Sequence, residues 1–168
     1  MVYLIGFMGA GKTTISNLLA NKLQVPFYDT DQEIEKNEKR SISDIFKKDG
    51  ELHFRMLETE VLKSINQNSI IACGGGLPIY NNNMELINSK GISIYLKASV
   101  NLLFDRLKKE KESRPLINNK TNKELEFYIK NELQNRNPFY TLSSKIILID
   151  DKSNDDILRE INTLISTF

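Results

Sequence analysis

Gly6-Phe7-Met8-Gly9-Ala10-Gly11-Lys12-Thr13 is the most informative stretch of this 168-residue chain. It fits the pattern G-x-x-x-x-G-K-[ST] at every position. The apolar run 2–5 precedes it, and residues 12–23 follow with apolar side chains at a helical period. A strand, a glycine-rich loop and a helix in this order form a phosphate-binding loop, because backbone N–H groups and a helix N-terminus then face anionic oxygens. The motif therefore predicts binding of a nucleoside triphosphate.

The polar residues of this loop each suit one part of phosphoryl-transfer chemistry. Lys12 is expected to reach the β- and γ-phosphates and to take part in catalysis, and the Thr13 hydroxyl is expected to bind Mg²⁺. Mg²⁺ would be the cofactor. The residues expected to contact the nucleotide are Gly9, Ala10, Gly11, Lys12, Thr13 and Thr14.

Strand and helix signals alternate along the rest of the chain. Besides 2–5, apolar runs predict strands at 27–28, 69–73, 92–96 and 145–149. Besides 12–23, helices are predicted at 41–48, 51–65, 84–88, 100–109, 123–136 and 155–165. Continuous apolar runs indicate strands buried on both faces, as in a parallel sheet. We predict an α/β fold, a three-layer sandwich with a five-stranded parallel sheet. It forms one domain over residues 1–168, with a mobile lid at about 108–121.

The composition excludes several classes of function. The net charge of +1 gives no basic field for nucleic acid or an anionic membrane. With one cysteine, Cys73, and one histidine, His53, a disulfide framework or a Cys/His zinc site is not expected. No apolar run approaches the ~20 residues of a membrane span, and the N-terminal residues do not resemble a signal peptide. We expect a cytoplasmic monomer with no nucleic-acid or membrane partner.

The remaining acids narrow the class of nucleotide-binding protein. The segment 119–122 lacks the acid of a guanine-reading N-K-x-D motif, and the strand at 69–73 has no acid at its end. Instead, Asp29 and Asp31 follow the strand at 27–28, where ligands of a parallel sheet bind. One carboxylate could hold Mg²⁺ through water and the other could accept a proton from an attacking hydroxyl. The alternative is a solvated turn in which an aspartate caps a helix.

Arginines and a triple glycine point to an anionic acceptor. Lysine supplies most of the positive charge, so Arg55, Arg114 and Arg136, each within two residues of a proline or an aromatic residue, are candidates for binding a carboxylate or phosphate. Surface arginines are the alternative. Gly74-Gly75-Gly76 ends the strand at 69–73 and could offer backbone N–H groups to a ligand, or could be a flexible turn.

Taken together, these motifs resemble the shikimate kinase family across nearly the whole chain. The resemblance implies a nucleoside-monophosphate-kinase-like fold. It also implies transfer of the γ-phosphoryl group of ATP to the 3-hydroxyl of shikimate, giving shikimate 3-phosphate and ADP in aromatic amino-acid biosynthesis. The matching segments are LIGFMGAGKTT, FYDTDQEIE, SISDIF, GELHFRMLETEVL, IIACGGGLP, SRPLI and RNPFY.

By motif position, the resemblance assigns roles to the acids and arginines. Asp31 would hold the substrate hydroxyls and act as base, and Asp29 would support Mg²⁺ through water. Arg114 would reach from the lid toward the transferring phosphoryl group. The residues implied in binding shikimate are Asp31, Phe46, Phe54, Arg55, Glu58, Gly74, Gly75, Gly76 and Arg136, of which Arg55 and Arg136 would bind the carboxylate.

The adenine contacts match the family less closely. Arg106 is the arginine available for stacking on adenine, and Lys108 or Lys109 could match as well. A second adenine contact would fall near 151–153, where no arginine is present. Two other functions stay open: a related kinase acting on gluconate or a nucleoside monophosphate, and a non-catalytic ATP-binding module.

Overall fold

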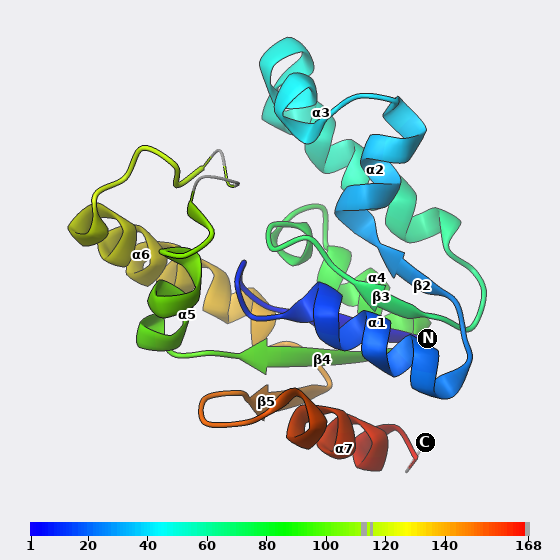
Figure 1. The fold of residues 1–168 in the computed structure, drawn as a ribbon. Coiled ribbons are helices and arrows are strands. Elements are labelled where there is room, and N and C mark those ends of the chain that lie inside the picture. The colour runs from blue at the N-terminus through cyan, green and yellow to red at the C-terminus, as the bar shows by residue number, and fades with distance from the viewer. Residues whose placement is uncertain (112–113, 115, 167–168) are drawn as a thin grey trace.

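The computed structural model describes residues 1–111, 114 and 116–166. Five strands form one parallel sheet within these residues, in the order β2-β3-β1-β4-β5 (Figure 1). The strands are β1 (Val2–Ile5), β2 (Phe27–Asp29), β3 (Ile70–Ala72), β4 (Ile92–Lys97) and β5 (Lys145–Leu148). The helices are α1 (Lys12–Leu23), α2 (Thr30–Glu38), α3 (Ile42–Ser64), α4 (Asn83–Lys90), α5 (Val100–Leu107), α6 (Asn122–Tyr140) and α7 (Asn154–Ile165), with a 3₁₀ turn η1 (Leu77–Ile79).

The strand order places the phosphate loop at the centre of the sheet. Strand β1 pairs with β3 on one side, Val2 opposite Ile70, and with β4 on the other, Val2 opposite Ile92. The chain thus builds one half of the sheet before crossing β1 to build the other. Ligands of open parallel sheets bind at the carboxyl ends of the strands beside such a crossing. In Figure 1, β4 points left, and the dark-blue loop after β1 lies at that end.

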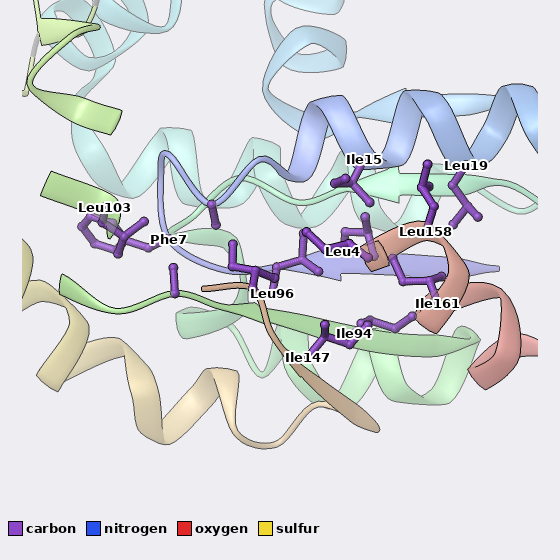
Figure 2. Close-up of a cluster of buried hydrophobic side chains, with 14 of the residues drawn as sticks. Leu4, Phe7, Ile15, Leu19, Ile94, Leu96, Leu103, Ile147, Leu158 and Ile161 are labelled. Carbon is purple, nitrogen blue, oxygen red and sulfur yellow. The ribbon is translucent and has the colours of Figure 1, made fainter. Parts of the chain in front are cut away.

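Side chains of the central strand alternate between two buried clusters, one on each face of the sheet. Val2 and Leu4 join a cluster with residues of α1, α5, α6 and α7, whereas Tyr3 and Ile5 join a cluster with residues of α2, α3 and α4. Figure 2 shows the first cluster, in which side chains of α1 and α7 meet those of β1, β4 and β5. Helices therefore cover both faces, which confirms the predicted three-layer α/β fold with a five-stranded parallel sheet.

Two helices differ from the sequence prediction in ways that matter for the site. Helix α2 was not predicted, because Ile34 is the only apolar residue in Thr30–Glu38 and no hydrophobic stripe marks it. Helix α6 continues past residue 136 to Tyr140, with Pro138 inside its last turn. Proline lacks the N–H that would continue the ladder. The Thr141 hydroxyl donates to the Asn137 carbonyl at 2.8 Å and satisfies an acceptor at this helix end.

The segments predicted as separate helices at 41–48 and 51–65 form one element with a break. Gly50 has φ 82° and ψ 173° within α3, a conformation open essentially to glycine alone. The prediction of two helical pieces separated at Asp49-Gly50 therefore holds. Within the described residues, no helix combines the length and the apolar character needed to cross a membrane.

Candidate active site

The phosphate loop curls around the start of α1. Gly9 and Gly11 have φ of 80° and 88°, which directs the backbone into a tight concave turn. The Lys12 ammonium donates a hydrogen bond to the Phe7 carbonyl at 3.0 Å, across the mouth of the loop. The Arg106 guanidinium of α5 donates to the Gly9 carbonyl at 2.9 Å, which ties α5 to the loop.

The Lys12 ammonium lacks solvent in this position. Only 9% of the residue is exposed, and burial lowers the pKa of Lys12 to about 8, although Asp31 and Asp29 act in the opposite direction. An anionic ligand would raise the pKa of Lys12 again, because it stabilises the protonated amine. The Lys12 position therefore suits a phosphate oxygen.

Asp29 performs two tasks at the end of β2. One carboxylate oxygen, Oδ1, caps α2 by accepting the N–H of Asp31 at 3.1 Å and of Gln32 at 3.4 Å. The other, Oδ2, accepts the Thr13 hydroxyl at 2.7 Å. Asp29 therefore caps a helix, as the alternative interpretation of the sequence suggested. It also lies close to Thr13, as a role in Mg²⁺ binding requires.

The residues around Thr13 and Asp29 fit Mg²⁺ in the form that phosphoryl-transfer sites use. A hydroxyl and a carboxylate supply oxygen ligands, and Mg²⁺ usually takes one or two such groups plus substrate phosphates and waters. Among the described residues, no group of three or more His, Cys, Asp or Glu side chains is arranged to hold a metal ion. The cation would therefore take its remaining ligands from nucleotide phosphates and water.

Asp31 lies beside the triple glycine, and its surroundings raise its pKa. Burial raises the pKa of Asp31 to about 6, and the Asp29 carboxylate raises it further, whereas Lys12 and Arg55 lower it. A carboxylate with a pKa nearer neutrality is a better proton acceptor for a hydroxyl than an ordinary aspartate. Asp31 is therefore suited to act as a general base.

Arg55 is fixed by two glutamates on its own helix, α3. Its Nη1 donates to Glu58 Oε2 at 2.8 Å and its Nη2 to Glu51 Oε1 at 2.9 Å, while the guanidinium stacks on the Tyr80 ring with Cζ 4.4 Å from the centroid. Glu58 is 1% exposed, and burial raises its pKa to about 7 against the opposing effect of Arg55. The two glutamates orient the Arg55 guanidinium at the cavity wall, because a buried charge that leaves its partners loses their stabilisation.

A glutamate four residues earlier pairs with each of the three candidate arginines. Glu51 pairs with Arg55, Glu110 with Arg114 at 3.0 Å to Nε, and Glu132 with Arg136. The sequence prediction did not include these glutamates. For Glu51 in α3 and Glu132 in α6, the spacing was the available signal, since residues i and i+4 of a helix are neighbours on its surface.

The triple glycine leaves room for the side chains that surround it. A Cβ at Gly74 would lie 3.1 Å from Glu58 Oε1, and one at Gly75 would lie 3.3 Å from Arg136 Nη1. A Cβ at Gly76 would lie 2.9 Å from Arg55 Cζ. The three glycines thus allow two acids and two arginines to approach one short turn.

Two adjoining cavities bring nearly all predicted site residues together. One, of about 430 Å³, includes the phosphate loop, the two aspartates and Arg106. The other, of about 280 Å³, includes the aromatic residues Phe46 and Phe54, whose ring centroids are 4.7 Å apart. Four residues line both cavities: Met8, Asp31, Gly75 and Arg114. Asp31 and Arg114 therefore lie where the two compartments meet.

Several residues differ from or add to the predicted set. Ala10 lines neither cavity and packs in the core instead. Lys108 and Lys109 are also absent from the lining of the larger cavity, whereas Arg106 belongs to it. Asn154, the first residue of α7, lines the larger cavity just beyond 151–153. The lining residues that the sequence prediction missed are Met8, Ile42, Cys73, Glu110, Leu116 and Asn154.

Comparison with known proteins agrees with this arrangement. A family model described as shikimate kinase matches residues 8–166. The shikimate kinase of Flavobacterium psychrophilum is 43% identical, covering 98% of each chain. That of Azobacteroides pseudotrichonymphae is 42% identical over 95% of this chain and 96% of its own.

Solved structures give the same result. The crystal structure of shikimate kinase from Bacteroides thetaiotaomicron superposes with a TM-score of 0.92 at 34% identity, covering 98% of this chain and 97% of the other. The Acinetobacter baumannii shikimate kinase, solved in complex with shikimate, has a TM-score of 0.87 at 35% identity and coverage of 99% and 92%. The deoxyadenosine kinase of M. mycoides, at 20% identity and a TM-score of 0.61, shares the fold. The chain therefore belongs to the shikimate kinase family of ATP-dependent kinases.

Proposed function

We propose that this kinase transfers the γ-phosphoryl group of ATP to the 3-hydroxyl of shikimate, giving shikimate 3-phosphate and ADP. The observation that carries the proposal is the junction of the two cavities at Asp31 and Arg114. One cavity has the cationic, amide-lined wall that phosphates require, and the other has arginines suited to a carboxylate. A relative of the same family has been solved in complex with shikimate.

Asp31 takes the proton of the attacking hydroxyl in this proposal. The acceptor oxygen forms a bond to the γ-phosphorus, the bond to the bridging oxygen of ADP breaks, and the hydroxyl proton passes to an Asp31 carboxylate oxygen. Lys12 and Arg114 neutralise charge on the phosphoryl oxygens as it develops. Most of the rate enhancement then comes from positioning and electrostatic stabilisation.

Arg55 and Arg136 hold the carboxylate of the acceptor. Both guanidiniums are largely buried, with 13% and 12% of their side chains exposed, and both line the smaller cavity. Because their glutamate partners already orient them, little side-chain entropy remains to be lost on binding. The Phe46 and Phe54 rings and Glu58 shape the rest of the compartment.

Thr13 and, through water, Asp29 would hold Mg²⁺ with the nucleotide. The ion would supply charge neutralisation at the β- and γ-phosphates. Arg106, which lines the larger cavity, is the proposed contact for the adenine base.

The segment from about residue 108 to 121 is the proposed lid. Arg114 lines both cavities, so movement of this segment would change access to the reacting groups. Closure would exclude water, which otherwise competes as acceptor and hydrolyses ATP. Residues 112, 113 and 115 of the proposed lid lie outside the described residues.

The proposal includes a monomer acting in the cytoplasm, where ATP is available. All the residues that the proposed mechanism uses belong to one chain. Light scattering on the purified protein tests this, and a dimer at micromolar concentration would contradict it. The edge strand β5, with Ile146 and Leu148 exposed, is the place to examine in that event.

A coupled ADP-release assay distinguishes the possible acceptors. The wild-type enzyme receives ATP–Mg²⁺ with shikimate, gluconate, a nucleoside monophosphate or no acceptor, and the Lys12→Ala variant is the inactive control. We expect ADP release only with shikimate. ADP release with another acceptor would favour a related small-molecule kinase. ADP release at a rate that does not depend on shikimate would refute the proposal.

A further inference from the structure

Two buried hydroxyl groups form hydrogen bonds with the backbone of the triple-glycine turn. The Gly74 N–H donates to Thr30 Oγ1 at 2.8 Å, and the Tyr140 hydroxyl donates to the Gly75 carbonyl at 2.6 Å. Thr30 and Tyr140 are both 0% exposed. Thr30 stands between the two aspartates of the motif D-T-D, and Tyr140 ends the motif R-N-P-F-Y. The proposed mechanism uses neither residue.

These bonds determine where the other groups of the turn point. In a planar trans peptide, the C=O of one residue and the N–H of the next point in opposite directions. Because Tyr140 holds the Gly75 carbonyl, the Gly76 N–H points away from Tyr140. Likewise the Gly74 carbonyl accepts the N–H of Leu77 at 3.1 Å, so the Gly75 N–H points the other way.

Two donors of the turn remain available for a ligand. Among the residues that the structure describes, the N–H groups of Gly75 and Gly76 have no hydrogen-bond partner. Both glycines line the smaller cavity, in which Arg55 and Arg136 also lie. The Gly74 N–H, by contrast, is already taken by Thr30. An acceptor carboxylate would therefore meet two amide donors together with two guanidiniums.

We propose that Thr30 and Tyr140 are positioning residues that aim the Gly75 and Gly76 amides at the acceptor carboxylate. The inference rests on the proposed function, because it assigns these amides to the acid group of shikimate. The carboxylate lies away from the reacting hydroxyl, so the contact is equally strong in the ground state and the transition state. Loss of the positioning then raises KM for shikimate and leaves kcat nearly unchanged.

Tyr95 offers a matched control for Tyr140. It is 1% exposed, its ring centroid lies 5.1 Å from that of Tyr140, and its hydroxyl donates to Asn137 Oδ1 at 2.8 Å. Removing the Tyr95 hydroxyl breaks a buried hydrogen bond in the same cluster without affecting the glycine turn, whereas the Tyr140 hydroxyl contacts both the Gly75 carbonyl and the Arg136 guanidinium. The pair therefore separates an effect on stability from an effect on positioning.

The first experiment compares Tyr140→Phe with Tyr95→Phe by steady-state kinetics and thermal melting. We expect Tyr140→Phe to raise KM for shikimate about three- to thirty-fold, the equivalent of one lost hydrogen bond. KM for ATP and kcat should stay within about twofold, and Tyr95→Phe should leave all three parameters near wild type. An unchanged KM for shikimate in Tyr140→Phe, or an equal increase in Tyr95→Phe, would overturn the proposal.

Thr30 is tested by a pair of variants with opposite expectations. Thr30→Val keeps the shape but loses the acceptor for the Gly74 N–H, whereas Thr30→Ser keeps the hydroxyl. We expect Thr30→Val to raise KM for shikimate about three- to thirty-fold and Thr30→Ser to restore it to near wild type. If Thr30→Ser raises KM for shikimate as much as Thr30→Val while both variants melt like wild type, the hydrogen bond to Gly74 does not position the turn, and the proposal is refuted.

Tyr140 also interacts with the Arg136 guanidinium, so its two contacts must be separated. In an Arg136→Lys background, addition of Tyr140→Phe should still raise KM for shikimate, because the Gly75 carbonyl is released in either background. If the effect of Tyr140→Phe disappears there, Tyr140 acts through Arg136 alone and the turn plays no part. A wild-type enzyme without shikimate-dependent turnover would instead refute the proposed function, an outcome visible before any variant is made.

Discussion

At the residue scale, two aspartates of the site differ in their contacts and surroundings. Asp29 and Asp31 are identical in type, two positions apart and in the same cavity, yet Asp29 caps a helix and accepts the Thr13 hydroxyl, whereas Asp31 has a raised pKa. Burial, and the nearby Asp29 carboxylate, raise the pKa of Asp31. The proposed division of labour between a metal-supporting acid and a base therefore rests on position and not on residue type.

The proposed role of Asp31 as base predicts a loss of turnover when its charge is removed. Asp31→Asn keeps the size of the side chain but cannot accept a proton. We expect kcat to fall by roughly 10²–10⁴-fold, and by a larger factor than KM for shikimate rises. Steady-state kinetics with both substrates varied measures this. Wild-type turnover in Asp31→Asn would show that another group accepts the proton.

The raised pKa of Asp31 predicts how activity and stability depend on pH. With a pKa of about 6, the base is protonated below that pH, so kcat/KM should decrease there. The stabilising effect of protonation is fully present below the unfolded pKa of about 4 and is lost as the pH rises through about 6. Asp31→Asn should therefore melt about 2–8 °C above wild type at pH 7.5. Near pH 4 the variant and the wild type should melt at the same temperature. A lower Tm for Asp31→Asn than for wild type at pH 7.5 would contradict the raised pKa.

The space at Gly76 predicts a selective effect on shikimate binding. Gly76 has φ −89°, which alanine adopts without strain, but the added Cβ would lie 2.9 Å from Arg55 Cζ and displace that guanidinium. We expect Gly76→Ala to raise KM for shikimate about 10–100-fold, with KM for ATP unchanged. Gly75→Ala is the milder comparison, since its Cβ would meet Arg136 Nη1 at 3.3 Å. Wild-type shikimate kinetics in Gly76→Ala would mean that Arg55 can move without cost.

At the element scale, the break in α3 shapes the acceptor compartment. Gly50 divides the helix into a part that carries Phe46 and a part that carries Phe54, Arg55 and Glu58. The two phenylalanine rings meet across the break, 4.7 Å apart. A continuous straight helix would carry Phe46 in a different direction, so the break helps to form the pocket wall.

Substitution of Gly50 tests this arrangement. A Cβ at Gly50 has no atom within 4 Å, so the cost of Gly50→Ala comes only from its φ of 82°. We expect the free energy of unfolding to fall by about 1–3 kcal/mol and KM for shikimate to rise. Chemical denaturation and kinetics measure the two effects, with Lys48→Ala, at an exposed helical position, as the control. A variant as stable as wild type would show that the break does not need glycine.

At the scale of the whole molecule, the proposed function assigns different ligands to the two cavities. ATP and shikimate each stabilise the folded protein in proportion to the logarithm of ligand concentration over Kd, about 2.7 kcal/mol at a hundredfold excess. Arg136→Ala should lose the increase in Tm with shikimate and keep that with ATP–Mg²⁺, whereas Lys12→Ala should do the reverse. Loss of both increases in either variant would show that the compartments are not independent.

The sequence predicted those parts of the molecule that short-range patterns encode. Apolar runs mark all five strands, and the spacing in G-x-x-x-x-G-K-[ST] identifies the phosphate loop, since φ preferences and side-chain periodicity act within a few residues. Helix α2 escaped prediction because its one buried apolar residue, Ile34, leaves no period to detect. The end of α6 was missed because Pro138 ordinarily signals a helix boundary.

Only the tertiary structure decided which of these residues meet. The strand order brings Thr30 to Gly74 and Tyr140 to Gly75 across 44 and 65 residues of sequence. It also buries Asp31, Glu58 and Lys12 and so moves their pKa values toward neutrality. Contacts over such separations depend on how the layers pack around the sheet, and desolvation depends on every atom that surrounds a charge. The residue types and their local spacing therefore specify the reaction class, and the packing of distant segments determines the geometry and acidity with which the site would act.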